Sequence, residues 1–330
     1  MGLRKVSDHH PAAFFASIRA CLASVRLSTK LVGLRSVKLM SIAEQQISSK
    51  ISSELVSLRT QAAISDALDK ASAQRLFDSS SLSDRARLLS SSAPHAGDFL
   101  LCPPIAHLGL KLTPNEWCFA VAYKLGLQVL PSPVVCSANG CNALMDCQGL
   151  HAMRCGTEGD RIVRHNNLRN FFFKECQKAL VAPVLEPTNL VRNCGERPAD
   201  WGIPEYRPGR FMAYDVAVTD PTQQAYVAGA SATKSFAAES YAVNVKLAKY
   251  SNALSDSSLM LTPIVAETFG AWSKASYDFI SDLSRWLAAR DPSSSLSAIR
   301  SKLFQRVSVI LQRANARMLM SRISTVSYNY

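Results

Sequence analysis

The sequence lacks several features that would assign it to a common class of protein. No uninterrupted apolar run approaches the roughly 18 residues of a membrane span, so we expect no transmembrane helix and no membrane partner. Neither a glycine-rich phosphate loop nor a serine nucleophile elbow is present, which argues against the enzyme classes that those motifs define. Internal repeats are absent as well, which argues against a solenoid.

Acidic residues are in short supply. Lys and Arg number 37 against 25 Asp and Glu, and the formal net charge is +12. Such a surplus attracts polyanions, of which nucleic acid is the commonest, although a basic protein without that role would have the same balance. With 330 residues, 48% of them hydrophobic, the chain can bury the core of one large domain or two modest ones.

Nine cysteines are present, but a secreted disulfide protein would be smaller and would open with a signal peptide. Five of them are scattered singly and are typical of small buried apolar residues. The others cluster around a histidine, as Cys136-x4-Cys141-x9-His151-x3-Cys155 with Cys147 in between. Tetrahedral zinc takes four such ligands, so we predict structural Zn²⁺ on Cys136, Cys141, His151 and Cys155. Cys147 is an alternative ligand, and a coincidence of reduced thiols is the alternative to a metal site.

Residues 1–92 form the first predicted part of the chain, a basic helical region. Apolar residues recur at mixed spacings of three and four without strand alternation. The basic character persists as far as Arg87, which favours a helical segment that faces nucleic acid and a nuclear protein. A basic, acid-poor and serine-containing N-terminus also fits a mitochondrial transit peptide.

The second predicted part, 93–160, is a helical linker followed by the zinc knuckle. The third, 161–292, begins with a helix from Arg161 to Leu180 and continues in the order α-β-β-β-α-β-α, a mixed α/β unit in which helices flank a small mixed sheet. The expected strands are 184–186, 199–203, 210–218 and 261–269, and the expected further helices are 235–250 and 274–289.

The fourth predicted part, 293–330, is a basic amphipathic helix centred on 296–320. Its apolar stripe predicts one buried face. A solvated face and contact with phosphates account equally well for its basic arc, which comprises Lys302, Arg306, Arg313 and Arg317.

Two aspartates fall on consecutive predicted strands. If these strands pair antiparallel, Asp200 and Asp215 converge on one hard cation, and Glu186 is a third oxygen ligand. The alternative for Asp200 is a turn residue after Pro198. Asp215 is harder to explain without a partner, because a charge inside an apolar strand is costly to bury. The sequence therefore predicts a catalytic Mg²⁺ site.

Basic side chains surround these acids in the sequence. Lys246 and Lys249 lie one turn apart on a predicted helix, where a lysine can offset charge that develops on a phosphate. The alternative is that both are solvated, with Glu239 as a partner of Lys246. Glu267 is either a charge at the end of a strand or a support for the site. Nucleic-acid contacts are predicted for a further group, namely Arg161, Arg164, His165, Arg169 and Arg197.

Seven short motifs follow one another along the chain in a recognisable order. They are the Cys-x4-Cys and His-x3-Cys pairs, Arg164-His165-Asn166, Glu186-Pro187, Arg197-Pro-x-Asp200, Asp215-Val216 and Lys246-x2-Lys249-Tyr250. This order resembles the C-terminal region of site-specific non-LTR retrotransposon proteins, over about residues 95–290. That region joins a CCHC zinc knuckle to a restriction-like endonuclease of the PD-(D/E)XK superfamily, with an αβββαβ core.

The resemblance implies a metal-dependent endonuclease that nicks target DNA and leaves a 3′-hydroxyl to prime reverse transcription, with DNA and element RNA as partners. Asp200 and Asp215 would be the metal-binding acids, and Lys246, or less readily Lys249, the active-site lysine. The sequence departs from the pattern in two ways: Ala217 stands where the superfamily's lysine usually follows the second acid, and the Pro-Asp pair is Pro-Ala-Asp.

A reverse transcriptase signature, Tyr/Phe-x-Asp-Asp, is missing from the sequence. The chain is therefore expected to be a fragment of a larger polyprotein or a free-standing relic of one. The alternative to a nuclease is a catalytically decayed or domesticated element that keeps its zinc and binds nucleic acid.

Overall fold

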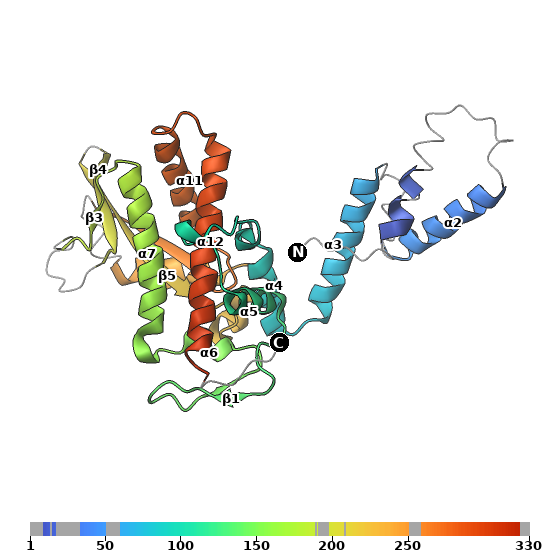
Figure 1. Ribbon diagram of the computed structural model, residues 1–330, viewed down its shortest axis with the longest axis horizontal. Coiled ribbons are helices and arrows are strands. Elements are labelled where there is room, and N and C mark those ends of the chain that lie inside the picture. The colour runs from blue at the N-terminus through green and yellow to red at the C-terminus, as the bar shows by residue number, and fades with distance from the viewer. Residues whose placement is uncertain are drawn as a thin grey trace. The chain divides into compact units, whose positions relative to one another are not determined.

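The computed structural model of the protein describes residues 9–13, 15–17, 34–50, 60–188, 190, 198–207, 209–250 and 259–323. The chain divides into two compact units, Met1–Ser80 and Ser81–Tyr330, which are described separately (Figure 1). Within the described ranges, no helix combines the length and the apolar character needed to cross a bilayer.

The smaller unit is helical. It contains α2 (Leu34–Ser48), α3 (Gln61–Ser79) and helical residues at 9–13 and 15–17. Thr60 begins α3, because its side chain accepts a hydrogen bond from the backbone N–H of Ala63. A small core holds the unit together, made of Ala12, Phe15, Ala16, Ala43, Ile47, Ile64 and Leu68. The predicted helical character is confirmed for these segments, whereas several of the basic residues behind the nucleic-acid prediction lie outside the described residues, among them Arg4, Lys5, Arg19, Arg26 and Lys30.

The larger unit is built on a four-stranded mixed sheet in the order β3-β4-β5-β6. The strands are β3 (Val184–Leu185), β4 (Trp201–Arg207), β5 (Arg210–Thr219) and β6 (Leu259–Glu267). The β3–β4 and β4–β5 pairs are antiparallel, and β5 pairs with β6 in parallel. The predicted mixed α/β class and mixed sheet are thereby confirmed, and β4 extends beyond the predicted strand.

The parallel β5–β6 pair requires a crossover, which the segment after β5 supplies. It contains α8 (Gln224–Tyr226), η4 (Val227–Ser231), α9 (Ala237–Tyr241) and η5 (Ala242–Leu247), and the last of these is a wide π-helical turn, as is η4. The sequence predicted a single regular helix here. This crossover covers one face of the sheet through small side chains, which let backbones approach closely: Ala217, Ala238, Ala242 and Val265.

Three long helices cover the other face: α7 (Asp160–Lys178), α11 (Lys274–Ala288) and α12 (Leu296–Met320). The alternation of β5 directs Tyr214 and Val216 into this layer and Asp215 and Ala217 towards the crossover. The main core between the sheet and these helices is rich in aromatic rings, including Phe172, Trp201, Tyr214, Phe279 and Phe304. Figure 1 shows α7 and α12 side by side in front of the sheet.

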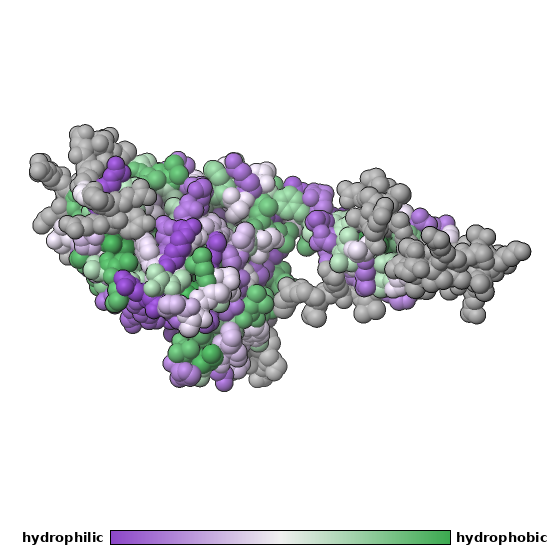
Figure 2. Space-filling model, turned by 90° about the horizontal axis from the view of Figure 1, so that it is seen from above, coloured by the Kyte–Doolittle hydropathy of each residue, from purple (hydrophilic) through white to green (hydrophobic). Residues whose placement is uncertain are grey.

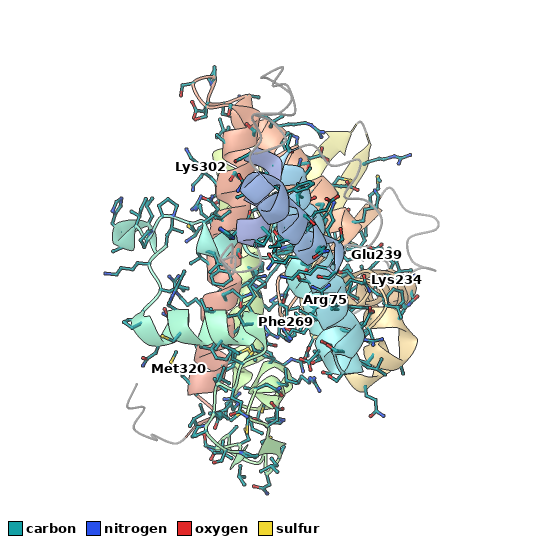
Figure 3. All side chains as sticks on the ribbon, turned by 90° about the vertical axis from the view of Figure 1, so that its right-hand side faces the viewer. Arg75, Lys234, Glu239, Phe269, Lys302 and Met320 are labelled. Atoms are coloured by element: carbon teal, nitrogen blue, oxygen red, sulfur yellow. The ribbon has the colours of Figure 1, made fainter. Side chains whose placement is uncertain are left out.

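A second layer packs on the far side of α12. It contains α4 (Leu82–Ser92), η1 (Asp98–Leu100), η2 (Ala106–Leu108) and α5 (Pro114–Leu125). Helix α5 begins after Thr113, which forms a reciprocal capping box with Glu116. In Figure 3, the labels Lys302 and Met320 lie near the two ends of α12, which spans the unit.

The basic arc of α12 is bound within the fold rather than simply solvated. Arg306 pairs with Glu175 at 2.8 Å, and Arg317 pairs with Glu116 at 2.8 Å. Arg313 also approaches Glu116, at 3.6 Å. Both glutamates are buried, so these arginines neutralise charges that would otherwise be costly inside the unit. The helix is therefore central to the larger unit and not an appendage.

Candidate metal centres

The first candidate centre gathers the predicted zinc ligands. Strands β1 (Val134–Val135) and β2 (Leu144–Met145) form an antiparallel hairpin, with Cys136 directly after β1 and Cys141 in the connecting turn. Helix α6 (Leu150–Arg154) carries His151, and Cys155 ends that helix. The ligand atoms of all four residues lie within 4.8 Å of one another.

The spacing of these atoms fits a tetrahedral ion. Zinc–sulfur bonds of about 2.3 Å place two sulfurs on one zinc roughly 3.7 Å apart. The Sγ atoms of Cys136 and Cys155 are 3.9 Å apart, and Cys141 Sγ lies 3.3 Å from His151 Nε2. The group can therefore bind a metal such as zinc. Cys147 lies outside it, and its carbonyl oxygen accepts hydrogen bonds from the backbone of Val129 and Leu130.

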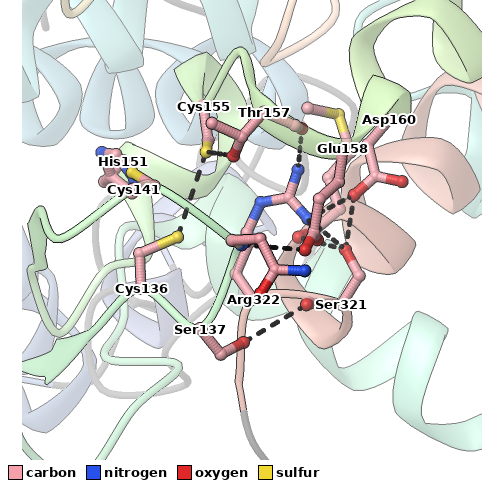
Figure 4. Close-up of polar contacts among 12 residues, drawn as sticks. Cys136, Ser137, Cys141, His151, Cys155, Thr157, Glu158, Asp160, Ser321 and Arg322 are labelled. Atoms are coloured by element: carbon pink, nitrogen blue, oxygen red, sulfur yellow. Dashed lines mark hydrogen bonds and ion pairs between the residues drawn. The ribbon is translucent and has the colours of Figure 1, made fainter.

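An arginine that follows α12 ties this knuckle to the rest of the unit (Figure 4). Arg322 is fully buried and pairs with Asp160 at 2.7 Å and with Glu158 at 3.1 Å. Its backbone carbonyl accepts a hydrogen bond from the backbone N–H of Ser137, one residue after Cys136. The knuckle is thus held from both sides of its ligand set by the C-terminal end of α12.

The second candidate centre lies where β4 and β5 pair. Antiparallel pairing sets Trp201 opposite Tyr214 and places Asp200 beside the start of β4. Asp200 Oδ2 accepts hydrogen bonds from the backbone N–H of Val216 at 2.6 Å and pairs with His165 Nε2 at 3.0 Å. Ligand atoms of His165, Asp200 and Asp215 all lie within 4.8 Å of one another. The two aspartates therefore converge as their sequence positions predicted.

The crossover helix brings a lysine to this group. Lys246 Nζ lies 2.6 Å from Asp215 Oδ2, within the π-helical turn η5. Such wide turns occur frequently at functional sites, because they shift a side chain out of regular register. Lys249, by contrast, lies with its ammonium 5.3 Å from the ring centre of Tyr250.

Burial and charge set the protonation of this group. Burial raises the pKa of Asp215 to about 6, and the neighbouring charge of Asp200 adds to this, while Lys246 partly opposes it. Burial alone would lower the pKa values of Lys246 and His165. Their carboxylate partners, Asp215 and Asp200 respectively, outweigh that effect and raise both. Each carboxylate of the site therefore lies against a basic side chain, Asp215 against Lys246 and Asp200 against His165.

An open cavity of about 520 Å³ lies beside this group, and its lining does not include the two aspartates. Lys246, His165 and the exposed Arg161 line it, together with Asn166 and Tyr241. The cavity is wide enough for a phosphate group, and carboxylate oxygens such as those of Asp200 and Asp215 are the ligands that Mg²⁺ or Mn²⁺ prefers. Arg161 thus lies where a phosphate contact was predicted.

Other predicted residues lie elsewhere. Glu186 is outside the carboxylate group, because its side chain pairs with Arg169 at 2.6 Å. Its contribution is indirect: its backbone N–H donates to the carbonyl oxygen of Asp200. The prediction of Glu186 as a third metal ligand is therefore not supported by its position, and the guanidinium of Arg169 is engaged at the same contact.

Arg164 requires a correction. It is buried, and its guanidinium donates to Asn315 Oδ1 at 2.9 Å and to the backbone carbonyl of Met153 at 3.2 Å. A side chain held this way braces α7 against α12 and α6 instead of contacting a phosphate backbone. Arg197 lies outside the described residues.

His165 has a role at the carboxylates that sequence reasoning missed. It was predicted as a nucleic-acid contact, but the structure places it against Asp200. The available signal was its position on the helix that precedes the strands, four residues before Arg169 and one helical turn after Arg161. Only the packing of α7 on the sheet decides which of these side chains points at the acids.

The raised pKa of Asp215 predicts how the stability of the protein depends on pH when no Mg²⁺ is added. Because the folded value of about 6 exceeds the ordinary value of 3.8, this carboxyl stabilises the fold below about pH 4 and loses that contribution as the pH rises to 6. The change is on the order of 2–3 kcal/mol. Asp215→Asn should lack this component in urea unfolding at a series of pH values. Identical pH dependence in both proteins would contradict the prediction.

Comparison of the sequence with known proteins identifies no significant relative. No protein-family model matches the chain, and a search among curated proteins gives no significant match either. Functional inference therefore depends on the positions of the side chains and on the order of the motifs.

Proposed function

We propose that the protein is a metal-dependent DNA endonuclease of the restriction-like type, derived from a non-LTR retroelement. The observation that carries the proposal is the convergence of Asp200 and Asp215, with Lys246 paired to Asp215 and lining the adjacent open cavity. A Cys/His group directly before α7 and a mixed four-stranded sheet after it support the proposal, because the motif resemblance implies a knuckle followed by a mixed α/β core.

Each side chain has a chemical task in this proposal. Asp200 and Asp215 would hold Mg²⁺, which polarises a phosphate and lowers the pKa of bound water. Lys246, which neutralises Asp215 in the metal-free arrangement, is then available to stabilise negative charge on the phosphate. His165 orients the carboxylate of Asp200, and Arg161 holds the DNA backbone at the mouth of the cavity.

The position of Lys246 also accounts for one departure from the superfamily pattern, the absence of a lysine two residues after the second acid. Ala217, where the strand lysine would stand, faces the crossover and is buried against it. The lysine that reaches the acids comes instead from that crossover, in a turn of π-helix. A lysine supplied from the helix replaces the missing strand lysine without any change in the sheet.

The second candidate function is nucleic-acid binding without catalysis, in a decayed or domesticated element. The observation that favours it is that the acid site is self-neutralised, because His165 and Lys246 each pair with one of the two carboxylates. Nicking of supercoiled plasmid with Mg²⁺ or Mn²⁺ separates the two functions. Protein that binds DNA but never cuts it would establish the second.

A matched pair of lysines tests the assignment within the helix. Lys246→Ala should slow nicking on the order of 10²-fold, as loss of a preorganised charge-stabilising group does. Lys249→Ala should have little effect, because that ammonium lies against Tyr250. Single-turnover nicking rates at saturating DNA measure both. Equal rates for the two variants would refute the role of Lys246.

A further inference from the structure

A second cationic surface lies on the larger unit, away from the acid pair. Helices α7 and α12 lie side by side (Figure 1). Side chains of both helices line an open groove of about 400 Å³. Its polar lining consists of Asn167, Asn170 and Lys174 from α7 with Arg313 and Arg317 from α12. In Figure 2, hydrophilic residues gather in patches on the larger unit between scattered hydrophobic ones.

The groove is separate from the candidate nuclease cavity. At about 100° per residue, Asn167, Asn170 and Lys174 lie roughly 140–200° around α7 from His165, on the opposite side of the helix. His165 points to the carboxylates beside the cavity. A ligand in the groove and a phosphate in the cavity would therefore contact different faces of α7 and would not compete for the same side chains.

Positive charge exceeds negative charge along this groove. Glu116 is shared by Arg313 and Arg317, and Glu175 is shared by Lys178 and Arg306. Lys174 is exposed and adds a fifth cation. Because both carboxylates are buried, a ligand in the groove meets the cations and not the acids. The lining itself holds three of these cations, Lys174, Arg313 and Arg317, and they share one carboxylate, Glu116, so two positive charges remain unneutralised there.

The chemistry of the lining favours a flexible polyanion with polar edges. A single nucleic-acid strand is bound by grooves that track its phosphates with positive charge. The amides of Asn167 and Asn170 can both donate and accept hydrogen bonds, which suits unpaired base edges as well as phosphates. In a duplex the Watson–Crick edges of the bases are already paired, so they are not available to these amides.

We propose that the α7–α12 groove binds an unpaired DNA strand through its phosphates. The choice of DNA over RNA rests on the proposed function, since nicking frees a strand end beside the enzyme, while binding in the groove itself requires no cleavage. The nuclease would then hold its target at the cavity and an unpaired strand on the other side of α7.

The test is binding of a labelled single-stranded DNA to the full chain without Mg²⁺, measured by fluorescence anisotropy over a series of salt concentrations. The double variant Lys174→Gln/Arg317→Gln removes two groove charges and leaves Glu116 paired with Arg313. The matched control, Lys274→Gln/Arg285→Gln, removes two exposed charges from α11. Circular dichroism of each variant checks the fold.

We expect the groove variant to bind the single strand at least roughly tenfold more weakly at low salt. The slope of log affinity against log salt concentration should fall in magnitude by about 1.4, because each of the two lost phosphate contacts contributes about 0.7 for a single strand. The control should resemble the wild type. Equal affinity and slope in the groove and control variants would overturn the proposal. So would a loss confined to duplex DNA, or a loss confined to single-stranded RNA of the same sequence. Because no cleavage is needed, a wild type that never nicks DNA leaves this result interpretable.

Discussion

Asp215→Asn is expected to abolish Mg²⁺-dependent nicking, by on the order of 10³-fold or more, while DNA binding stays nearly unchanged. Asparagine has the shape of aspartate but lacks the anionic oxygen that a hard cation requires. The loss should exceed that of a single charge-stabilising donor, which is typically about 10²–10³-fold. Asp200→Asn should have a similar effect, because its Oδ2 lies in the same ligand group. Plasmid nicking and anisotropy on one protein preparation give both quantities.

The substitution of Asp215 is well suited to this test because it should not unfold the protein. The carboxyl is buried and its pKa is raised to about 6, so a neutral side chain of equal size removes a cost of burial. Asp278→Asn is the matched control, since Asp278 is exposed on α11 and pairs only at the surface with Lys274. Nicking by the Asp215 variant at the wild-type rate would exclude the metal-binding role.

Removal of the metal from the knuckle is the second change with a large expected effect. Cys141→Ser should lose the bound zinc and destabilise the larger unit by several kcal/mol, since structural zinc in small modules contributes about 10–16 kcal/mol to folding. The loss should be smaller than that here, because the ion pairs of Arg322 with Glu158 and Asp160 also hold the knuckle to the larger unit. Metal analysis of freshly reduced protein and thermal unfolding measure the two effects.

Cys147 provides the matched control for the substitution of Cys141. Cys147→Ser removes a thiol of the same cluster that lies outside the ligand group, so its zinc content and melting temperature should match the wild type. Zinc lost equally from both variants would show that the ligand set is wrong. Wild-type protein that carries no zinc would refute the site altogether.

The sheet could be predicted because its strands carry their own signals. The runs Phe-Met-Ala-Tyr-Asp-Val-Ala-Val and Leu-Thr-Pro-Ile-Val-Ala are rich in β-forming residues and are flanked by turns. The convergence of Asp200 and Asp215 follows from antiparallel pairing of neighbouring strands, which is the commonest arrangement for segments so close in sequence. The four zinc-ligand positions carry the same kind of local signal in their spacing.

Side-chain partners from distant segments could not be predicted in this way. The sequence places Arg164 on a basic helix face, which predicts an exposed side chain. Its partner Asn315, however, is 151 residues away in the sequence and is brought near only by the packing of α12. The same applies to Glu116, whose buried carboxylate draws in Arg313 and Arg317 from α12. Charge patterns along one helix do not reveal which cations a neighbouring element will neutralise.

The anchoring of the knuckle by Arg322 has a consequence for synthesis in the cell. Cys155 leaves the ribosome about 170 residues before Arg322, which at about 5–20 residues per second is an interval of roughly 10–30 s. During that time the thiols of the nascent chain exist without the residue that braces them, and the buried Glu116 and Glu175 lack their arginines. The larger unit therefore cannot mature progressively from its N-terminal side. Its assembly awaits α12, and until then the nascent cysteines depend on early metal capture or on a reducing environment to remain competent.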